Sequence, residues 1–422
     1  MSTSKVLTEL IKRFPITEDT DLKPLVNFSQ NRRLPVHSWF DYKQGYSPEL
    51  ITKLAEEAGL VEGDWVIDPF NGVGTTLIAL DELGINGVGF DVNPVANLAA
   101  RVKCTRYTKN DLKFLDEWIG TTRFALVAPA PVPNYKSLPR IFSQDQLDQL
   151  LRIKHAIDSV KNQRIREFLL LAYISVIEPV SNRVKDGNGI KISKTKKPIL
   201  DVYGTFAKQT QSMISDLKSR KANRSEMNIV ERSLIESDEW VEKNSSKFAS
   251  AIFSPPYANC FDYLEVYKME MWMGGFVSEY SDFAQYRNAS VRSHVNSSFS
   301  KTLRRRLESV EVIAQALENT PLWNKNIPDM VRGYFDDMHE LMLRLHKILK
   351  KRGSVFIVVA NSSYRGVIVP TDLLLAESAA KIGFEVSEIR KARSIRGSSQ
   401  HMAQKHANSD LMRESVIILT KK

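Results

Sequence analysis

The tetrapeptide Ser254-Pro255-Pro256-Tyr257 places a hydroxyl and an aromatic ring on either side of two prolines. It follows an apolar run, 248–253, that is typical of a buried strand. Neither proline can continue a sheet, because each lacks an N–H and has a fixed φ, so the strand ends in a rigid loop. Rigid backbone carbonyls beside a stacking ring suit an enzyme that holds a flat base by its exocyclic amine. The plainer interpretation is a proline-rich turn that ends a strand.

A second group of residues suited to ligand binding lies upstream. A short apolar strand, 65–67, runs into Asp68-Pro-Phe-Asn-Gly-Val-Gly-Thr-Thr76, and a helical stretch over 77–83 follows. The glycines let the backbone approach a ligand, and the helix N-terminus offers free N–H groups. A second strand, 87–90, ends in Asp91, where a carboxylate can accept hydrogen bonds from ribose hydroxyls.

Asp68 distinguishes between two ligands that this pattern allows. A glycine turn with an acid about 20 residues further on suits a dinucleotide as well. A carboxylate at the tip of the first strand, however, would repel a pyrophosphate and suits a cationic or amine-bearing ligand. Together with the loop at 254–257, Asp68 favours S-adenosylmethionine (SAM) over a nicotinamide cofactor.

These motifs together resemble the DNA amino-methyltransferases, the N4-cytosine and N6-adenine enzymes of bacterial restriction–modification systems. The resemblance rests on the stretch from Asp68 to Thr76, on Gly89-Phe-Asp91-Val-Asn-Pro94 and on the tetrapeptide, and spans 61–103 and 228–275. It implies that an acid near 236–238 accepts from the adenine amine of SAM. The implied catalytic residues are Ser254, Pro255, Pro256 and Tyr257, and the implied SAM site comprises Asp68, Pro69, Phe70, Gly72, Gly74, Thr75, Asp91 and Asp238.

The resemblance implies a site-specific DNA methyltransferase that transfers a methyl group from SAM to the exocyclic amine of a flipped base. In the family, a serine at the first position of the tetrapeptide leans toward cytosine N4, whereas an aspartate leans toward adenine N6. Three alternatives stay open: an N6-adenine DNA enzyme, an RNA (guanine-N2) amine methyltransferase, and a non-catalytic SAM- and DNA-binding subunit. The implied partners are double-stranded DNA or RNA, and a cognate restriction endonuclease that forms no obligate complex.

Composition agrees with a polyanionic partner. The chain has 422 residues, enough for two or three domains, and a net charge of +10. Its N-terminus has no apolar signal core and no run is long enough to span a membrane, so we expect a cytoplasmic protein. Three basic stretches, 181–197, 287–306 and 390–401, are candidates for phosphate contacts, although a solvated basic face gives the same pattern.

The two cysteines, Cys104 and Cys260, exclude several chemistries. They form no disulfide framework and no zinc-ligand spacing, so we expect no metal. Methylation of cytosine at C5 requires a thiolate that follows a proline in those enzymes, and neither cysteine follows one. The expected reaction is therefore direct attack by an exocyclic nitrogen on the methyl group of SAM.

The expected fold is α/β: a doubly wound, seven-stranded, Rossmann-like SAM-methyltransferase sheet with a terminal antiparallel strand, plus a mainly helical insertion. The runs at 384–389 and 415–420 are the expected antiparallel pair. We expect three parts. Residues 1–60 cap the cofactor pocket, with Trp39 or Tyr42 either lining it or packing on the core. Residues 61–103 plus 228–422 form the catalytic domain, and 104–227 form the insertion that recognises or clamps the target.

Overall fold

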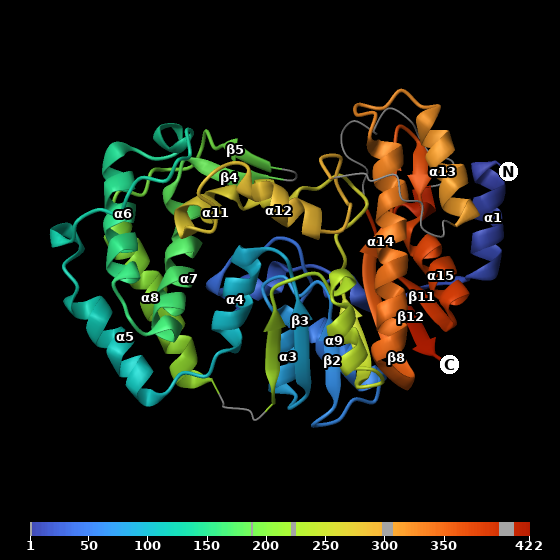
Figure 1. The fold of residues 1–422 in the computed structure, drawn as a ribbon, viewed down its shortest axis with the longest axis horizontal. Helices are drawn as coiled ribbons and strands as arrows, with labels where there is room; N and C mark the ends of the chain where they lie inside the picture. The colour runs from blue at the N-terminus through green and yellow to red at the C-terminus, as the bar shows by residue number, and fades with distance from the viewer. Residues whose placement is uncertain (1, 187–188, 221–224, 298–306, 396–408) are drawn as a thin grey trace.

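The computed structural model describes residues 2–186, 189–220, 225–297, 307–395 and 409–422 (Figure 1). Arg304, Arg305 and Arg306, and the second half of the predicted basic loop, 396–401, lie outside these ranges. Among the described residues, no helix combines the length and the apolar character needed to cross a membrane.

A large, mostly parallel sheet forms the centre of the molecule. In the described part of the chain it has eight strands, and β12 runs antiparallel to both of its neighbours while the other neighbouring pairs are parallel. The expected seven strands are joined by an eighth because β1, from the N-terminal segment, pairs with β11. In spatial order the strands are β1 (Ile16–Glu18), β11 (Phe384–Ser394), β12 (Arg413–Lys421), β8 (Leu349–Ala360), β7 (Phe248–Phe253), β2 (Trp65–Asp68), β3 (Asn86–Phe90) and β6 (Met227–Val230).

Helices cover both faces of the sheet, because successive strand residues point to opposite sides. In β2, Ile67 packs into one core cluster and Val66 into another. The Ile67 side is covered by α1 (Thr3–Arg13), α9 (Asp238–Lys243), α13 (Glu308–Glu318), α14 (Ile327–Ile348) and α15 (Thr371–Ile382). The Val66 side is covered by α2 (Pro48–Glu57) and α3 (Thr75–Glu82). This arrangement fits the expected Rossmann-like methyltransferase fold.

The insertion lies at the opposite end of the molecule from α13 and α15 (Figure 1). It consists of α5 (Lys109–Thr121), α6 (Gln144–Asp158), α7 (Gln163–Val180), the hairpin of β4 (Arg183–Asp186) and β5 (Gly189–Ile192), and α8 (Val202–Ser219). Its core is continuous with α4 (Pro94–Cys104) and with the helices that follow the tetrapeptide, α10 (Tyr263–Val266), α11 (Lys268–Gly274) and α12 (Asp282–Ala289). A small hairpin, β9 (Ser362–Tyr364) and β10 (Val367–Val369), follows β8.

Local sequence signals account for several helix boundaries. The Ser47 side chain caps α2, with Pro48 at its first position. Ser143 and Gln146 form a reciprocal capping box at the start of α6. Gly275, with a left-handed φ of 80°, ends α11. After the tetrapeptide the chain forms two short helices, α10 and α11, which meet at Tyr267.

Candidate active site

A cavity of about 440 Å³ opens at the carboxyl ends of β2, β3 and β7, where open α/β sheets bind their ligands. The α11–α12 segment and the β4–β5 hairpin lie above these strand ends (Figure 1). The wall includes all four residues of the tetrapeptide and most of the predicted cofactor residues. Those that line it are Asp68, Pro69, Phe70, Gly72, Thr75, Asp91, Ser254, Pro255, Pro256 and Tyr257.

Asp68 ends β2 as a buried carboxylate that is held from three sides. Its Oδ1 accepts from the Phe70 N–H at 2.9 Å, while its Oδ2 accepts from the Thr76 hydroxyl and, at 3.3 Å, from Tyr46. Burial raises the pKa of Asp68 to about 7, and the hydrogen bonds to its charged form oppose that rise. The carboxyl group therefore changes charge near neutral pH.

Asp91 joins the loops that follow the first two strands of the cofactor motif. Its Oδ2 accepts from the Gly72 N–H at 2.8 Å and its Oδ1 from the Asn93 N–H at 2.8 Å. Burial raises the pKa of Asp91 from its ordinary value, against these backbone hydrogen bonds. Because each carboxylate oxygen has two lone pairs, Asp91 keeps acceptor capacity for a ligand in the cavity.

Two predicted cofactor residues lie elsewhere. Gly74 caps α3 with a left-handed φ of 86°, and a Cβ there would approach the Ala100 backbone to 3.2 Å, so it serves close packing on α4. Asp238 lies at the start of α9, where its side chain is 82% exposed and pairs with Arg344. Neither residue lies in the wall of the cavity; for Asp238 the reason is that the chain after β6 turns away before it reaches α9. Arg232 and Ser233 stand in the wall there instead.

The tetrapeptide loop is held by hydrogen bonds to distant strands. Tyr257 donates from its hydroxyl to Glu414 Oε1 at 2.7 Å, and Ser254 Oγ lies 3.4 Å from the same hydroxyl. Behind the loop, the Tyr364 hydroxyl of β9 donates to the Ala258 carbonyl at 2.7 Å. Burial, reinforced by Glu414, raises the pKa of Tyr257 well above its ordinary value, so its hydroxyl stays protonated at neutral pH.

Buried amide groups in the wall have no partner within the described chain. Asn71, which is 5% exposed, has neither its side-chain oxygen nor its nitrogen hydrogen-bonded, and Asn93 Nδ2 is also unpaired. Both residues line the cavity. Since buried polar groups normally find partners, these atoms mark where a polar ligand would bind. The sequence analysis did not single out either asparagine, although both lie inside the motifs that it identified.

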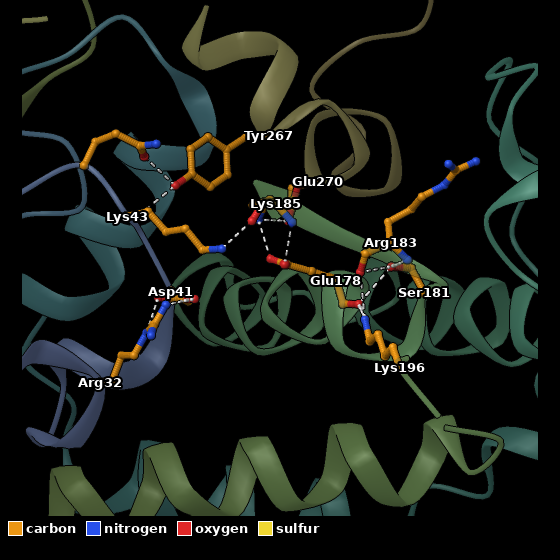
Figure 2. A network of polar contacts seen from close by, with 11 residues as sticks. Arg32, Asp41, Lys43, Glu178, Ser181, Arg183, Lys185, Lys196, Tyr267 and Glu270 are labelled. Atoms are coloured by element: carbon orange, nitrogen blue, oxygen red, sulfur yellow. Dashed lines mark hydrogen bonds and ion pairs between the residues drawn. The ribbon is translucent and has the colours of Figure 1, made fainter. Parts of the chain in front are cut away.

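The insertion supplies part of the same wall through Lys185 of β4. Figure 2 shows Lys185 directed at Glu270 and Glu178, whose carboxylates both pair with its ammonium group. Burial lowers the pKa of Lys185, but the two carboxylates outweigh this and raise it overall. The ammonium also lies 4.4 Å from the centre of the Tyr267 ring. The β4–β5 hairpin is thus fixed to α7 of the same insertion and to α11 outside it, beside the cavity.

The N-terminal segment contributes Tyr42 to the wall, and Trp39 does not reach it. Tyr42 stacks on Tyr267 with ring centres 5.0 Å apart and lies against Gly72, where a Cβ would meet it at 3.3 Å. Trp39 is buried and donates its indole N–H to Asp216 of α8 at 2.8 Å, so it packs on the insertion. Residues 1–60 therefore contact both the cavity and the insertion.

His294 is a further buried residue of the wall that the sequence analysis missed. Burial lowers the pKa of His294, which favours the neutral form of its ring. His294 lies within the second predicted basic stretch, 287–306, in which Arg287 pairs with Asp262 and Arg292 with Asp337. These two arginines are consequently committed to internal ion pairs.

Comparison with known proteins supports the resemblance found in the motifs. Residues 22–100 match the family described as DNA methylase. The chain is 26% identical to the type II methyltransferase M.BsoBI of Geobacillus stearothermophilus, over 97% of this chain and 91% of that protein. It is 25% identical to the type II methyltransferase M.AvaI of Nostoc sp., over 92% of this chain and 87% of that protein.

Two further matches are weaker, one to a short stretch of a relative and one to a solved structure. A stretch of 95 residues, 22% of this chain and 18% of that protein, is 38% identical to the type II methyltransferase M.MjaII of Methanocaldococcus jannaschii. Among solved structures, the [4+2]-cyclase SpnF aligns over 99% of this chain and 93% of that chain at 9% identity, with a TM-score of 0.31. The predicted resemblance to DNA amino-methyltransferases of the restriction–modification type is confirmed by the methylase match and by the relatives that span nearly the whole chain.

Proposed function

We propose that this relative of the type II methyltransferases transfers a methyl group from SAM to the exocyclic amine of a flipped base in DNA, with cytosine N4 as the acceptor. One observation carries the proposal: the tetrapeptide loop and the Gly72–Asp91 loops line a single cavity. A ring and hydrogen-bond acceptors for a base therefore face the same space as a glycine turn and a ribose-binding acid.

The residues of the wall fit SAM. Asp91 offers acceptor oxygens to the ribose, and Gly72 brings backbone close to the ligand without a side chain. The unpaired amide atoms of Asn71 and Asn93 add donors and an acceptor for its polar groups. The buried carboxyl of Asp68 is suited to a ligand with positive charge. SAM, when bound, supplies the methyl group.

The tetrapeptide holds the acceptor base. Tyr257 offers its ring for stacking, which replaces the stacking that a base loses when it leaves the duplex. The Ser254 hydroxyl and the Pro255 carbonyl accept hydrogen bonds from the exocyclic N–H groups and thereby direct the nitrogen lone pair at the methyl group. Most of the rate then comes from positioning rather than from a strong base. The proton leaves after the nitrogen is alkylated.

The choice of cytosine N4 rests on the serine at the first position of the tetrapeptide, as the family resemblance implies. The insertion, 104–227, is the proposed target-recognition region. Its β4–β5 hairpin lies above the strand ends (Figure 1). Lys185 of that hairpin lines the cavity and pairs with Glu270 of α11. A segment in this position can contact the DNA strand that carries the flipped base.

The test uses purified protein, SAM with a labelled methyl group, and mixed-sequence duplex DNA, with tRNA in a parallel reaction. The products are digested to nucleosides and separated by mass spectrometry. We expect labelled N4-methylcytosine from DNA. Labelled N6-methyladenine would retain the mechanism and reject the base. Label that is found in RNA and absent from DNA would replace the proposal with an RNA amine methyltransferase.

A binding experiment on the same sample distinguishes the proposed enzyme from a non-catalytic SAM- and DNA-binding subunit. A protein that binds SAM and DNA tightly but transfers no label to either nucleic acid would reject the proposed activity. The Ser254→Ala variant is the matched control, because it removes one proposed acceptor and leaves the loop's two prolines in place.

A further inference from the structure

We propose that Glu414 is a positioning residue, which fixes the ring of Tyr257 and sets the Ser254 hydroxyl as an acceptor for the target amine. The inference rests on the proposed function, because it concerns how the same tetrapeptide works. Glu414 lies in β12, about 160 residues beyond the loop in the sequence, and its carboxylate faces the same cavity.

The direction of the hydrogen bonds follows from the number of protons. Glu414 is a carboxylate and can only accept, so the single phenolic proton of Tyr257 is donated to Glu414 Oε1 at 2.7 Å. The phenolic oxygen then keeps only lone pairs toward Ser254. The Ser254 hydroxyl, 3.4 Å away, must therefore direct its own proton at Tyr257. Its lone pairs remain available for an N–H of the base amine.

The carboxylate is itself fixed in place. Glu414 is 3% exposed, and its Oε2 accepts from Arg393 Nε at 2.5 Å across the β11–β12 pair. The residues before and after it, Arg413 and Ser415, point to the other side of the strand and both donate to Asp372 at 2.8 Å. Glu414 can thus neither turn to solvent nor slide along the sheet.

A glutamine at this position would reverse the chain of donors. Arg393 is a charged donor and would take the amide oxygen, which leaves the amide N–H₂ group facing Tyr257. The phenol would then accept from that amide and direct its own proton at Ser254. One of the two lone pairs of Ser254 would then be occupied by the phenol, so the hydroxyl would be a poorer acceptor for the amine of the base. The side chain's volume hardly changes, so the packing of the ring is kept.

The main variant is Glu414→Gln, with Glu385→Gln as the matched control. Glu385 is an exposed glutamate of the neighbouring strand, β11. We expect Glu414→Gln to lower the single-turnover rate of methyl transfer roughly 10- to 100-fold, the loss typical of a hydrogen bond to a charged group. SAM affinity and thermal midpoint should stay close to those of the control. Equal single-turnover rates for the two variants would overturn the proposal.

A double-mutant cycle separates positioning from general damage to the sheet. Tyr257→Phe keeps the ring and removes the phenol through which Glu414 acts. In that background Glu414→Gln should change the rate by less than about 2-fold, because coupled residues are not additive. A full 10- to 100-fold loss in the Tyr257→Phe background would show that Glu414 acts by another route, and would also overturn the proposal.

A readout independent of activity distinguishes failure of this inference from failure of the proposed function. Protein labelled with 3-fluorotyrosine gives a fluorine NMR signal for Tyr257, assigned by its absence in Tyr257→Phe. We expect Glu414→Gln to shift that signal and Glu385→Gln to leave it unchanged. An unmoved signal refutes the contact whatever the enzyme's activity. A shifted signal in a protein that methylates no DNA would leave the contact standing and reject the proposed reaction.

Discussion

The backbone N–H of Gly72 donates to Asp91 Oδ2 over 2.8 Å, so one carboxylate ties the glycine turn after β2 to the end of β3. The same carboxylate accepts from the Asn93 N–H through its other oxygen. Asp91 therefore shapes the turn that a cofactor would lie on, in addition to offering lone pairs to that cofactor. Its removal should affect the ligand more than the fold, since the strands on both sides are buried.

The first prediction concerns SAM affinity. Asp91→Ala removes both the acceptor for the ribose and the clamp on Gly72. We expect the dissociation constant for SAM to rise by at least about tenfold, as for the loss of a charge-assisted hydrogen bond. Isothermal titration calorimetry measures it, with Glu56→Ala, an exposed acid of α2, as the control. Unchanged affinity would remove Asp91 from the cofactor site.

The second prediction concerns pH. Burial raises the pKa of Asp68 to about 7 from an ordinary value near 3.8, so the folded protein binds a proton that the unfolded chain has released between these values. The stability from this group is fully present below pH 3.8 and is lost as the pH rises through about 7. The free energy of unfolding, measured with urea, should therefore fall more between pH 5 and pH 8 in wild type than in Asp68→Asn.

Asp68→Asn will be less stable in absolute terms, because an N–H₂ group replaces one of the two oxygens that accept from Phe70 and Thr76, and it can only donate. The comparison is therefore between the pH slopes and not between the stabilities. Parallel slopes for the two proteins would mean that Asp68 does not titrate in this range.

The third prediction separates binding from chemistry at Tyr257. Tyr257→Ala removes the ring that is proposed to stack on the base, a contact that contributes about 1–3 kcal/mol in other proteins. We expect nearly complete loss of methyl transfer, about 100-fold or more, while SAM affinity survives. Single-turnover kinetics and calorimetry on the same preparation test it. Comparable loss in both measurements would assign Tyr257 to the cofactor or to the fold.

The fourth prediction uses a close approach between two loops. A Cβ on Gly89 would lie 2.4 Å from Asn71 Cγ, inside the buried wall of the cavity. Gly89→Ala should therefore displace Asn71, destabilise the protein by about 1–3 kcal/mol, as overpacking does, and weaken SAM binding. Gly120→Ala, in α5, meets no atom within 4 Å and should be neutral or slightly stabilising. Equal stability and SAM affinity in the two variants would contradict this account.

The sequence was informative where chemistry and local structure lie in one short segment. The loop at Ser254 and the turn at Gly72 were each predicted from a short apolar strand that is followed by prolines or glycines and a few polar residues. Both line the cavity. Local rules could not supply Glu414, because it reaches Tyr257 from a strand 157 residues away. Lys185 looked like one lysine of a basic loop, and only the packing of α7 and α11 buries it.

The errors at Asp238 and at β1 also arise from long-range structure. Asp238 was assigned on the family resemblance, yet a short turn at 234–236 carries the chain to the surface before Asp238 is reached. The three-residue strand β1 is too short to show a hydrophobic period, and it forms because β11 offers an unpaired edge. Long-range pairing of this kind has no local signal.

The fifth prediction tests the buried ion pair that fixes the insertion to the rest of the molecule. Lys185 and Glu270 have side chains 3% and 1% exposed, and Glu270 Oε2 has no other partner. Lys185→Met would leave Glu270 buried without its counter-ion and would also remove the ion pair of Glu178; breaking a buried pair in this way costs about 3–5 kcal/mol in other proteins. Adding Glu270→Met removes the charge of Glu270 and should restore much of the lost stability, because a well-packed apolar pair can replace a buried ion pair.

Chemical unfolding compares wild type, Lys185→Met and the double variant with Lys191→Met, whose exposed pair with Asp186 should contribute less than about 1 kcal/mol. If Lys185→Met were no less stable than Lys191→Met, the insertion would be fixed by its apolar contacts alone, and Lys185 would be free to serve the cavity.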